Sequence, residues 1–446
     1  MYFFYRLFSA AAMIFLAPYY LLRGWRRGGS AQAFRERLGA MSAEISAQAS
    51  QAAASGANAI WIHAVSVGEV LAAKPMVDGL RTRFPNRPIF VSTTTETGQR
   101  LARERLANAD GVFYFPLDWV VPVRRALGGI RPSAVIVMET EIWPNFLREA
   151  RRNGVPVIFA NARISPKSFA RFKRWEFLVG PFFAETLQDA TLFLPQSDED
   201  ASRLAAMGAS TQKIETIGNL KYDAEPPELS AFASWLEQQI RQQERWPVIV
   251  AGSIVAGEED AVIAAYDMVQ RQWRHTLLIL APRKPDRFES AAKLSAEGGW
   301  KVLRRSQLNL SLPLDEEVDI LVLDSIGELA ALYSFADVTF VGGSLVASGG
   351  HNILEPAWFS RPPVFGTSME NFQDMADQFL NGRAGVQVAS AQGLGKTWIQ
   401  LIENSALREA MGKSALTIAE RNRGTAQRSL DRIAPLIENA AKGPGA

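Results

Sequence analysis

The feature that most constrains the fold is an alternation that occurs twice along the chain: short apolar runs are separated by amphipathic helical stretches. The runs lie at residues 59–65, 88–93, 112–117, 134–139, 156–162 and 191–196, and again at 247–253, 276–282, 301–306, 319–325, 338–344 and 362–366. They are apolar almost throughout, without a regular change to polar residues at every second position. This pattern is typical of parallel strands covered by helices on both faces, and it predicts an α/β fold of the doubly wound kind.

A chain of 446 residues is too long for one ordinary hydrophobic core, so two domains are expected. The alternation stops at residues 223–246, a Pro- and charge-rich segment that we interpret as a linker. We therefore predict one Rossmann-like domain over 28–222 and a second over 247–425, with a C-terminal helix or tail over 426–446. In such domains ligands bind at the carboxyl ends of the strands.

The composition argues against several classes of function. Hydrophobic residues make up 48% of the chain and charged residues 21%, as in globular proteins. The formal net charge of +2 gives no support for a nucleic-acid partner. Cysteine is absent, and the only histidines are His63, His275 and His351. Disulfides, thiolate nucleophiles and a histidine-rich metal cluster are therefore not expected.

The N-terminus contains an uncharged, mostly apolar run at residues 7–22, and Arg23, Arg26 and Arg27 follow it. A cleaved signal peptide would carry its positive charge before the apolar run. A buried core helix is a second alternative, but we favour a membrane anchor over residues 1–27. The run is shorter than the ~20 residues that span a bilayer comfortably, so the anchor either spans the membrane or lies in its interface. The arginines would then keep the rest of the chain on the cytoplasmic side.

Charged side chains follow three segments of the first predicted domain. Glu69 begins a helix after the first strand, where it either complements the helix dipole or acts as a base. A helix N-terminus lowers the pKa of a carboxylate, whereas desolvation by a bound lipid would raise it. Glu139 and Glu141 follow a buried strand, a costly place for a carboxylate that has no function. Lys221 precedes the linker and is either an anion clamp or a solvated surface lysine.

A basic and aromatic stretch at residues 165–183 follows the fifth predicted strand. Its aromatic residues alternate with the cations Lys167, Arg171, Lys173 and Arg174. One interpretation is an amphipathic helix with a solvated basic side. The other is a surface for anionic lipid headgroups, which the nearby anchor favours.

The strand ends of the second predicted domain carry residues suited to a nucleotide sugar. Residues 251–259 form a Gly/Ser turn that could offer backbone N–H groups to an anion, although they do not match a dinucleotide or P-loop motif. Arg283 follows the next strand, within reach of a phosphate, and Glu328 begins a helix after another. The segment 342–356 adds a glycine-rich turn followed by polar residues, of which His351 is either structural or a ligand contact.

Seven motifs complete the pattern: SVGE (66–69), METEIWPN (138–145), NARIS (161–165), GNLKYD (218–223), PRKPDRF (282–288), DSIGEL (324–329) and GGSLVASGGHNILEP (342–356). In these motifs and in their order, the chain resembles the Kdo transferases of lipopolysaccharide synthesis. The resemblance extends from about residue 1 to residue 425.

The resemblance implies a two-domain glycosyltransferase of the GT-B type with a cleft between its domains. It would transfer 3-deoxy-D-manno-octulosonic acid (Kdo) from CMP-Kdo to the lipid A precursor, lipid IVA, with inversion of the anomeric centre. The implied place of action is the cytoplasmic face of the inner membrane, with no metal and no cofactor besides the donor CMP-Kdo. The alternatives are another GT-B enzyme that uses a UDP-sugar and a membrane-tethered nucleotide-binding module without turnover.

The resemblance also implies roles for individual residues. Glu69 matches the catalytic base, and Glu139 and Lys221 match positions that stabilise the transition state. The positions that match CMP contacts are Pro282, Arg283, Ile326, Gly327, Glu328, Asn352, Ile353, Leu354 and Glu355. Two positions depart from the family pattern, because Val255 and Lys284 stand where the family commonly has histidine.

Overall fold

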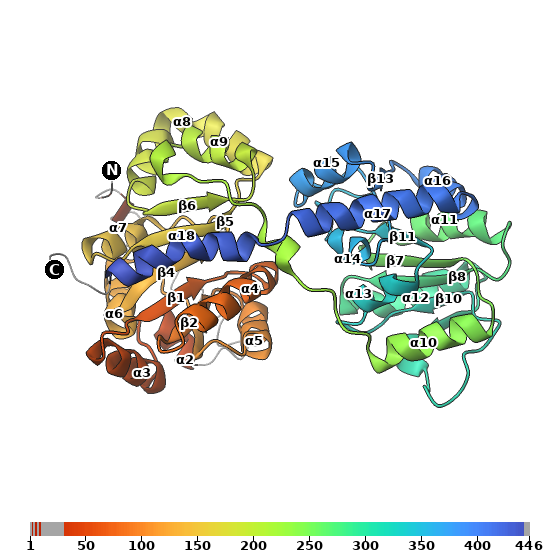
Figure 1. The fold of residues 1–446 in the computed structure, drawn as a ribbon, viewed down its shortest axis with the longest axis horizontal. Helices are drawn as coiled ribbons and strands as arrows, with labels where there is room; N and C mark the ends of the chain where they lie inside the picture. Colours follow the sequence, from red (N-terminus) through yellow and green to blue (C-terminus); the bar gives the residue numbers. More distant parts are fainter. Residues whose placement is uncertain (1, 3–4, 7–8, 10–30, 441–446) are drawn as a thin grey trace. The chain divides into compact units, whose positions relative to one another are not determined.

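The computed structural model describes Tyr2, Tyr5, Arg6, Ser9 and residues 31–440. The chain divides into two compact units, shown in Figure 1. Unit 1 combines the chain up to Ala224 with the segment from Gly424 onward, and unit 2 is Glu225–Arg423.

Unit 1 is built on a parallel sheet with the strand order β3-β2-β1-β4-β5-β6. Its strands are β1 (Ala59–His63), β2 (Ile89–Thr93), β3 (Gly111–Tyr114), β4 (Pro132–Met138), β5 (Val157–Ala162) and β6 (Leu192–Pro195). Its helices are α2 (Ala31–Arg37), α3 (Ala43–Ala54), α4 (Val67–Arg83), α5 (Glu96–Arg105), α6 (Val120–Ile130), α7 (Pro144–Arg152), α8 (Pro166–Leu187), α9 (Asp198–Ala206), η1 (Thr211–Lys213), η2 (Leu220–Asp223) and α18 (Thr425–Ala440). Successive residues of β1 enter opposite cores: Ile60 and Ile62 pack in one, and Trp61 packs in the other. Burial on both faces explains why the strands are apolar without alternation.

Unit 2 contains a second parallel sheet, in the order β13-β12-β11-β7-β8-β10-β9. Its strands are β7 (Val248–Ile254), β8 (Leu277–Pro282), β9 (Val302–Arg304), β10 (Ile320–Val322), β11 (Val338–Val341), β12 (Val364–Phe365) and β13 (Val386–Gln387). Its helices are α10 (Ala231–Gln242), α11 (Glu259–Gln270), η3 (Pro285–Arg287), α12 (Phe288–Glu297), η4 (Arg305–Gln307), α13 (Leu329–Leu332), η5 (Tyr333–Phe335), α14 (Leu354–Ala357), α15 (Gln373–Asn381), α16 (Ala391–Glu403) and α17 (Ser405–Arg421). All twelve predicted strands are present, and only the two-residue strand β13 was not anticipated.

Two segments show how the units use the ends of the predicted domains. Residues 223–246 contain α10, whose Phe232 and Leu236 are buried in a core of unit 2. At the other end of the chain, α18 packs against α4 and β4 of unit 1, as Figure 1 shows. Asp223 caps this helix, since its carboxylate accepts hydrogen bonds from the backbone N–H groups of Gly424 and Ala426. The C-terminal helix is therefore part of the first sheet's cover.

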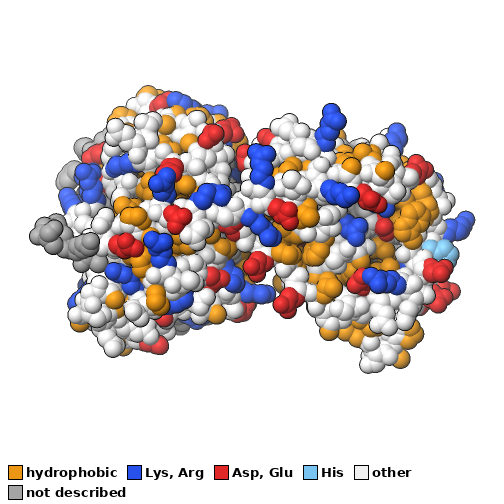
Figure 2. All heavy atoms as spheres, in the orientation of Figure 1, with side chains coloured by type: hydrophobic (Ala, Val, Ile, Leu, Met, Phe, Trp, Pro, Cys, Tyr) orange, Lys and Arg blue, Asp and Glu red, His pale blue; other side chains and the backbone are white. Residues whose placement is uncertain are grey.

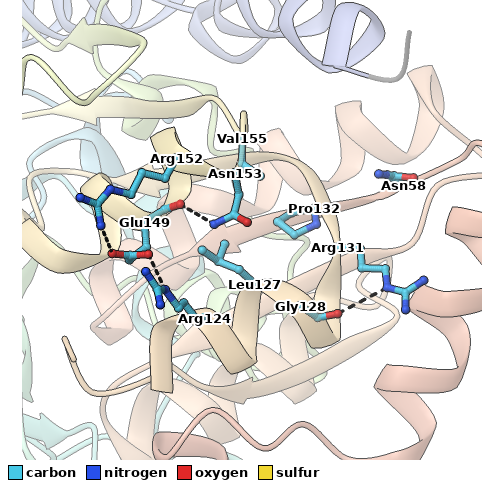
Figure 3. Close-up of a pocket in the computed structure, with 10 residues that line it drawn as sticks. All are labelled: Asn58, Arg124, Leu127, Gly128, Arg131, Pro132, Glu149, Arg152, Asn153 and Val155. Carbon is cyan, nitrogen blue, oxygen red and sulfur yellow. Dashed lines mark hydrogen bonds and ion pairs between the residues drawn. The ribbon is translucent and has the colours of Figure 1, made fainter. Parts of the chain in front are cut away.

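The described residues at the N-terminus are held on unit 1 by polar contacts. The hydroxyl of Tyr5 donates to Asp118 at 2.8 Å, and the guanidinium of Arg6 donates to Glu149 at 2.8 Å. Figure 3 shows that Glu149, which is 1% exposed, also pairs with Arg124 and Arg152. These arginines therefore compensate a buried carboxylate at the N-terminal edge of the sheet.

The predicted anchor at residues 1–27 lies outside the described residues, apart from Tyr2, Tyr5, Arg6 and Ser9. In the part of the chain that the structure describes, no helix is both long and apolar enough to cross a membrane. Figure 2 shows basic and acidic side chains interspersed over the visible face, in keeping with the small net charge.

Candidate active site

Glu69 lies directly after the turn that follows β1 and is 6% exposed. The hydroxyl of Ser66 donates to its Oε1 at 2.9 Å, and the backbone N–H of Val65 donates to its Oε2 at 2.8 Å. Ser66 is also the N-cap of α4 and accepts from the N–H of Glu69. The Ser–x–x–Glu spacing thus forms a reciprocal cap, which fixes the carboxylate at the carboxyl end of the strand.

Burial raises the pKa of Glu69 to about 7. The hydrogen bonds from Val65 and Ser66 oppose this shift, whereas the negative charges of Glu139 and Glu141 add to it. The protein alone therefore provides the desolvation that the sequence analysis assigned to a bound lipid. A carboxylate with a pKa near neutrality is matched to proton transfer at physiological pH.

Glu139 follows β4 in a left-handed conformation, with φ of 53°. Its backbone N–H donates to the carbonyl of Ala160 on β5 at 2.9 Å. Residues other than glycine rarely adopt this conformation, which costs on the order of 1 kcal/mol and redirects the chain at the sheet edge. Burial, together with the charge of Glu139, also raises the pKa of Glu141. The carboxylates predicted at this strand end therefore share one electrostatic environment with Glu69.

Lys221 belongs to the same group. Burial lowers the pKa of its ammonium, and the positive charge of Arg163 acts in the same direction. The negative charges of Glu139 and Glu69 oppose both effects. Unit 1 thus brings together the three residues that the sequence analysis assigned to catalysis.

An amide network that the sequence analysis did not identify holds the Lys221 segment. Asn161 follows the left-handed path at the end of β5, with φ of 55°, and its Oδ1 accepts from the N–H of Leu220 at 2.9 Å. Asn219 accepts from the N–H of Lys221 at 3.0 Å and donates to Gln196 at 2.9 Å. Gln196 in turn donates to the carbonyl of Asn161 at 3.0 Å. The available sequence signal was Gln196, the one amide side chain at the end of the run 191–196.

Helix α8 carries the predicted lipid surface. Lys167, Arg171, Lys173 and Arg174 are all exposed. Phe172 packs in the core, whereas Trp175, Phe177 and Leu178 are 50%, 80% and 56% exposed. We call these four cations and three apolar side chains the α8 surface. Large apolar side chains exposed beside cations are unusual on a purely solvated helix.

In unit 2, Arg283 follows β8, and its exposed side chain acts electrostatically on two groups of the 342–356 segment. Burial raises the pKa of Glu355 to about 7, against the opposing effects of Arg283 and a hydrogen bond from Asn352. His351 contacts the carbonyl of Gly342 through Nδ1 at 2.8 Å, and burial lowers its pKa. Since a carbonyl only accepts, this nitrogen carries the proton and the histidine secures the loop.

Several predicted CMP contacts are limited by their surroundings. Ile353 and Leu354 are buried as whole residues, so neither exposes a side chain or a backbone group to a ligand. The carboxylate of Glu328 accepts from Arg305 at 3.1 and 3.2 Å. Gly327 has φ of 92°, and the adjacent Ile326 is 79% exposed. Pro282 ends β8 and Arg283 follows it, whereas Asn352 precedes α14 and Glu355 lies within that helix.

The sequence predicted that the Gly/Ser turn after β7 offers backbone N–H groups to a bound anion. Two of these N–H groups are already occupied within the protein. The N–H of Val255 donates to Glu258 and that of Gly257 donates to Glu259. The N–H groups of Gly343 and Ser344 also donate to Glu258. The protein's own carboxylates occupy these donors, because a buried carboxylate needs hydrogen-bond partners.

The described part of the chain contains no group of three or more His, Asp or Glu side chains that could hold a metal ion. His63 is fully buried and stacks on Phe115, with ring centroids 3.9 Å apart. Burial lowers the pKa of His63 to about 3, so it is a neutral core residue.

Comparisons with known proteins identify the family. Residues 32–224 match the model for 3-deoxy-D-manno-octulosonic-acid transferase (kdotransferase). The chain is 32% identical over 436 residues to the 3-deoxy-D-manno-octulosonic acid transferase of Bordetella pertussis, covering 94% of this chain and 96% of that protein. The chain belongs to the 3-deoxy-D-manno-octulosonic acid transferase family. The Haemophilus influenzae member is 31% identical over 380 residues, covering 85% of this chain and 87% of that protein.

Solved structures support the fold. Anabaena HepE in complex with UDP aligns with a TM-score of 0.57 at 14% identity, covering 84% of this chain and 100% of that chain. The UDP-GlcNAc 2-epimerase of Neisseria meningitidis aligns with a TM-score of 0.54 at 13% identity, covering 84% and 99%. The two parallel-sheet α/β units of this Kdo transferase family member therefore resemble GT-B glycosyltransferases, as the sequence predicted.

Proposed function

We propose that this protein transfers Kdo from CMP-Kdo to lipid IVA with inversion of the anomeric carbon. Membership of the Kdo transferase family gives the reaction class, and the name of the relatives gives the sugar. The observation that carries the mechanism is Glu69, a buried carboxylate with a pKa of about 7 at the carboxyl end of a strand.

Glu69 is the proposed general base. It takes the proton of the acceptor hydroxyl while the hydroxyl oxygen forms a bond to C2 of Kdo. The bond between C2 and the phosphate oxygen of CMP breaks, and CMP departs with the electron pair. Base catalysis of this kind typically contributes roughly 10²–10⁴-fold to the rate.

Glu139 and Lys221 are the proposed stabilisers of the transition state. The carboxylate of Glu139 favours the positive charge that develops on the sugar ring, and the ammonium of Lys221 favours the negative charge that develops on oxygen. The amide network around Asn161 and Asn219 holds the Lys221 backbone in place. Preorganised charges are effective here because the protein does not have to reorganise during the reaction.

Unit 2 is the proposed donor-binding unit. Arg283 binds the phosphate of CMP, while Asn352 and Glu355 bind hydroxyl or base groups. The loop at residues 326–328 provides Gly327 and the backbone beside it. Neither Val255 nor Lys284 takes part in this scheme, although the family commonly has histidine at both positions.

We further propose that the protein acts at the cytoplasmic face of the inner membrane. The apolar run at 7–22 would anchor the chain, and the α8 surface would contact acidic headgroups through its cations and the interface through Trp175 and Phe177. Neither a metal nor a further cofactor is part of the proposal, and chelation with EDTA should leave transfer intact.

The experiment is to incubate the purified full chain with CMP-Kdo and lipid IVA and to weigh the lipid product by mass spectrometry. A mass gain of one or more Kdo residues, with release of CMP, supports the proposal and gives the number of sugars added. A lipid of unchanged mass would contradict it, provided that a known Kdo transferase modifies the same lipid preparation.

A further inference from the structure

Glu258 is a fully buried carboxylate in the segment between β7 and α11. Its Oε1 accepts from the N–H groups of Ser344 and Leu345, each at 2.8 Å. Its Oε2 accepts from Gly343 at 2.6 Å and from Val255 at 3.1 Å. Four backbone donors therefore compensate one buried negative charge.

These donors form the kind of concave backbone arrangement that binds anions in many proteins. Three of them come from consecutive residues at the end of β11, where Gly343 has φ of 68°. Successive N–H groups that converge in this way make a ready site for a phosphate. In this protein the side chain of Glu258 already fills the arrangement.

The glycines of the loop permit this contact. A Cβ built on Gly342 would lie 2.8 Å from Oε2 of Glu258 and 2.7 Å from the carbonyl oxygen of Ser253. Any larger residue at this position would push the loop away from the carboxylate. The absence of a side chain at Gly342 thus allows the carboxylate of Glu258 to lie against the start of the loop.

The same loop leads to the proposed donor ligands. The N–H of Gly350 donates back to the carbonyl of Gly343 at 2.7 Å, and His351 contacts Gly342. Asn352 and Glu355 follow directly. On the neighbouring strand, the N–H of Arg283 donates to Ile254, the residue before Val255, at 2.8 Å. The Glu258 carboxylate therefore connects the segments after β7 and β11, and the latter carries residues that we propose to bind CMP-Kdo.

We propose that Glu258 is a positioning residue for the donor. By occupying the backbone anion site with its own carboxylate, it fixes the 342–356 loop and leaves the donor's phosphate to the side chain of Arg283. Glu258 itself does not touch the nucleotide. The proposal rests on the proposed function in one respect, namely that unit 2 binds CMP.

The test is the affinity of the full chain for CMP, measured by titration calorimetry. Glu258→Ala should bind CMP roughly 10- to 100-fold more weakly, because a displaced loop misplaces its ligands. Sodium formate should restore much of the lost affinity by occupying the vacated anion site, and it should not change the affinity of the wild type. If Glu258 contributed only through the packing of its side chain, and not through its carboxylate, formate would not restore the affinity.

Glu259→Ala is the matched control. Glu259 is 2% exposed and adjacent, but its carboxylate holds Arg287 and the N–H of Gly257 rather than the loop. This variant should lose thermal stability while keeping its CMP affinity. If Glu258→Ala does not fold, Glu258→Gln replaces it, since the amide keeps the size but turns an N–H group toward the backbone donors.

The outcomes separate the two proposals. If the wild type binds no CMP, the proposed donor is wrong. If the wild type binds CMP and the Glu258 variants bind it equally well, the positioning role is wrong. For Glu258→Ala, weaker binding that formate does not restore would show that Glu258 supports the fold of unit 2 without acting as an internal anion. For Glu258→Gln, whose amide fills the site, CMP binding as tight as that of the wild type would contradict the positioning role.

Discussion

Two buried carboxylates, Glu69 in unit 1 and Glu258 in unit 2, follow strands of the two sheets but have opposite surroundings. In unit 1, Glu69 is desolvated and close to other negative charges, and its pKa rises to about 7. In unit 2, Glu258 is equally buried but accepts four backbone N–H groups. Ion pairs hold two further carboxylates: the buried Glu259 pairs with Arg287, and the partly buried Glu328 pairs with Arg305. The contrast is therefore between two individual carboxylates: the environment of Glu69 favours the bound proton, whereas the carboxylate of Glu258 holds a loop.

This difference agrees with the tasks that we propose for the two units. Desolvation combined with like charges is the arrangement that tunes a base, and saturated hydrogen bonding is the arrangement that rigidifies a binding site. Glu355 is the exception in unit 2, since burial raises its pKa to about 7. Its place in the 342–356 segment is consistent with a carboxylate that hydrogen-bonds a ligand hydroxyl.

The largest expected effect is that of Glu69→Gln. The amide cannot take a proton, so kcat for Kdo transfer should fall by roughly 10²–10⁴-fold. CMP affinity, measured by calorimetry, should stay within a few-fold. Glu96→Gln is the matched control, because Glu96 occupies the first turn of α5 but is exposed. Near-normal transfer by the Glu69 variant would show that Glu69 is not the general base.

The next effect is that of Arg283→Gln on the donor. Loss of hydrogen bonds to a charged phosphate, at about 1.5–3 kcal/mol, should weaken CMP binding roughly 10- to 100-fold. The pH dependence of transfer should not change, because the proposed role of Arg283 is to bind the phosphate of CMP and not to transfer a proton. Lys293→Gln removes an exposed charge from the same unit and serves as the control. Equal CMP affinity in the two variants would mean that another group binds the phosphate.

A smaller effect is expected at the α8 surface. Replacing Trp175 and Phe177 together by alanine should reduce binding to vesicles that contain acidic phospholipid by roughly 10-fold, since their apolar area no longer enters the interface. Co-sedimentation measures the effect. Leu312→Ala provides the comparison, because Leu312 is 59% exposed in unit 2. If the two variants sediment alike, α8 is simply a solvated helix.

A last expected effect concerns stability and leaves the reaction aside. The pKa of Glu69 is raised in the folded protein from 4.5 to about 7. The folded state therefore binds the proton more tightly than the unfolded state, and stability falls as pH rises from about 4.5 to about 7. The cost is on the order of 3 kcal/mol above that range and absent below it. Glu69→Gln should raise Tm at pH 8 but not at pH 4; an equal change at both would contradict the shift.

The sequence predicted the two sheets because buried parallel strands are apolar on both faces, as Ile60 and Trp61 illustrate. It also placed Glu69 and Glu139 correctly, since strand ends meet at one edge of a sheet. It could not identify Glu258, because a glutamate before a helix has the same local pattern whether it is solvated or buried. Nor could it place α18, since an amphipathic pattern does not specify the sheet on which a helix packs.

The pKa of Glu69 itself also lay beyond the sequence. The residue's position in the first turn of α4 favours a low pKa, and only its burial and the nearness of Glu139 reverse that effect. Such a balance depends on neighbours that are distant along the chain, so it becomes visible only once the sheet has formed.

The most direct test of a base tuned by unit 1 is the pH dependence of kcat/KM for the wild type and for Glu139→Gln. In the wild type, kcat/KM should rise with pH to a plateau, with a midpoint near the Glu69 pKa of about 7. The negative charge of Glu139 raises the pKa of Glu69. Glu139→Gln removes this charge and should therefore move the midpoint to lower pH, whatever activity remains. A profile without a midpoint near neutrality, or one that Glu139→Gln leaves in place, would contradict the account.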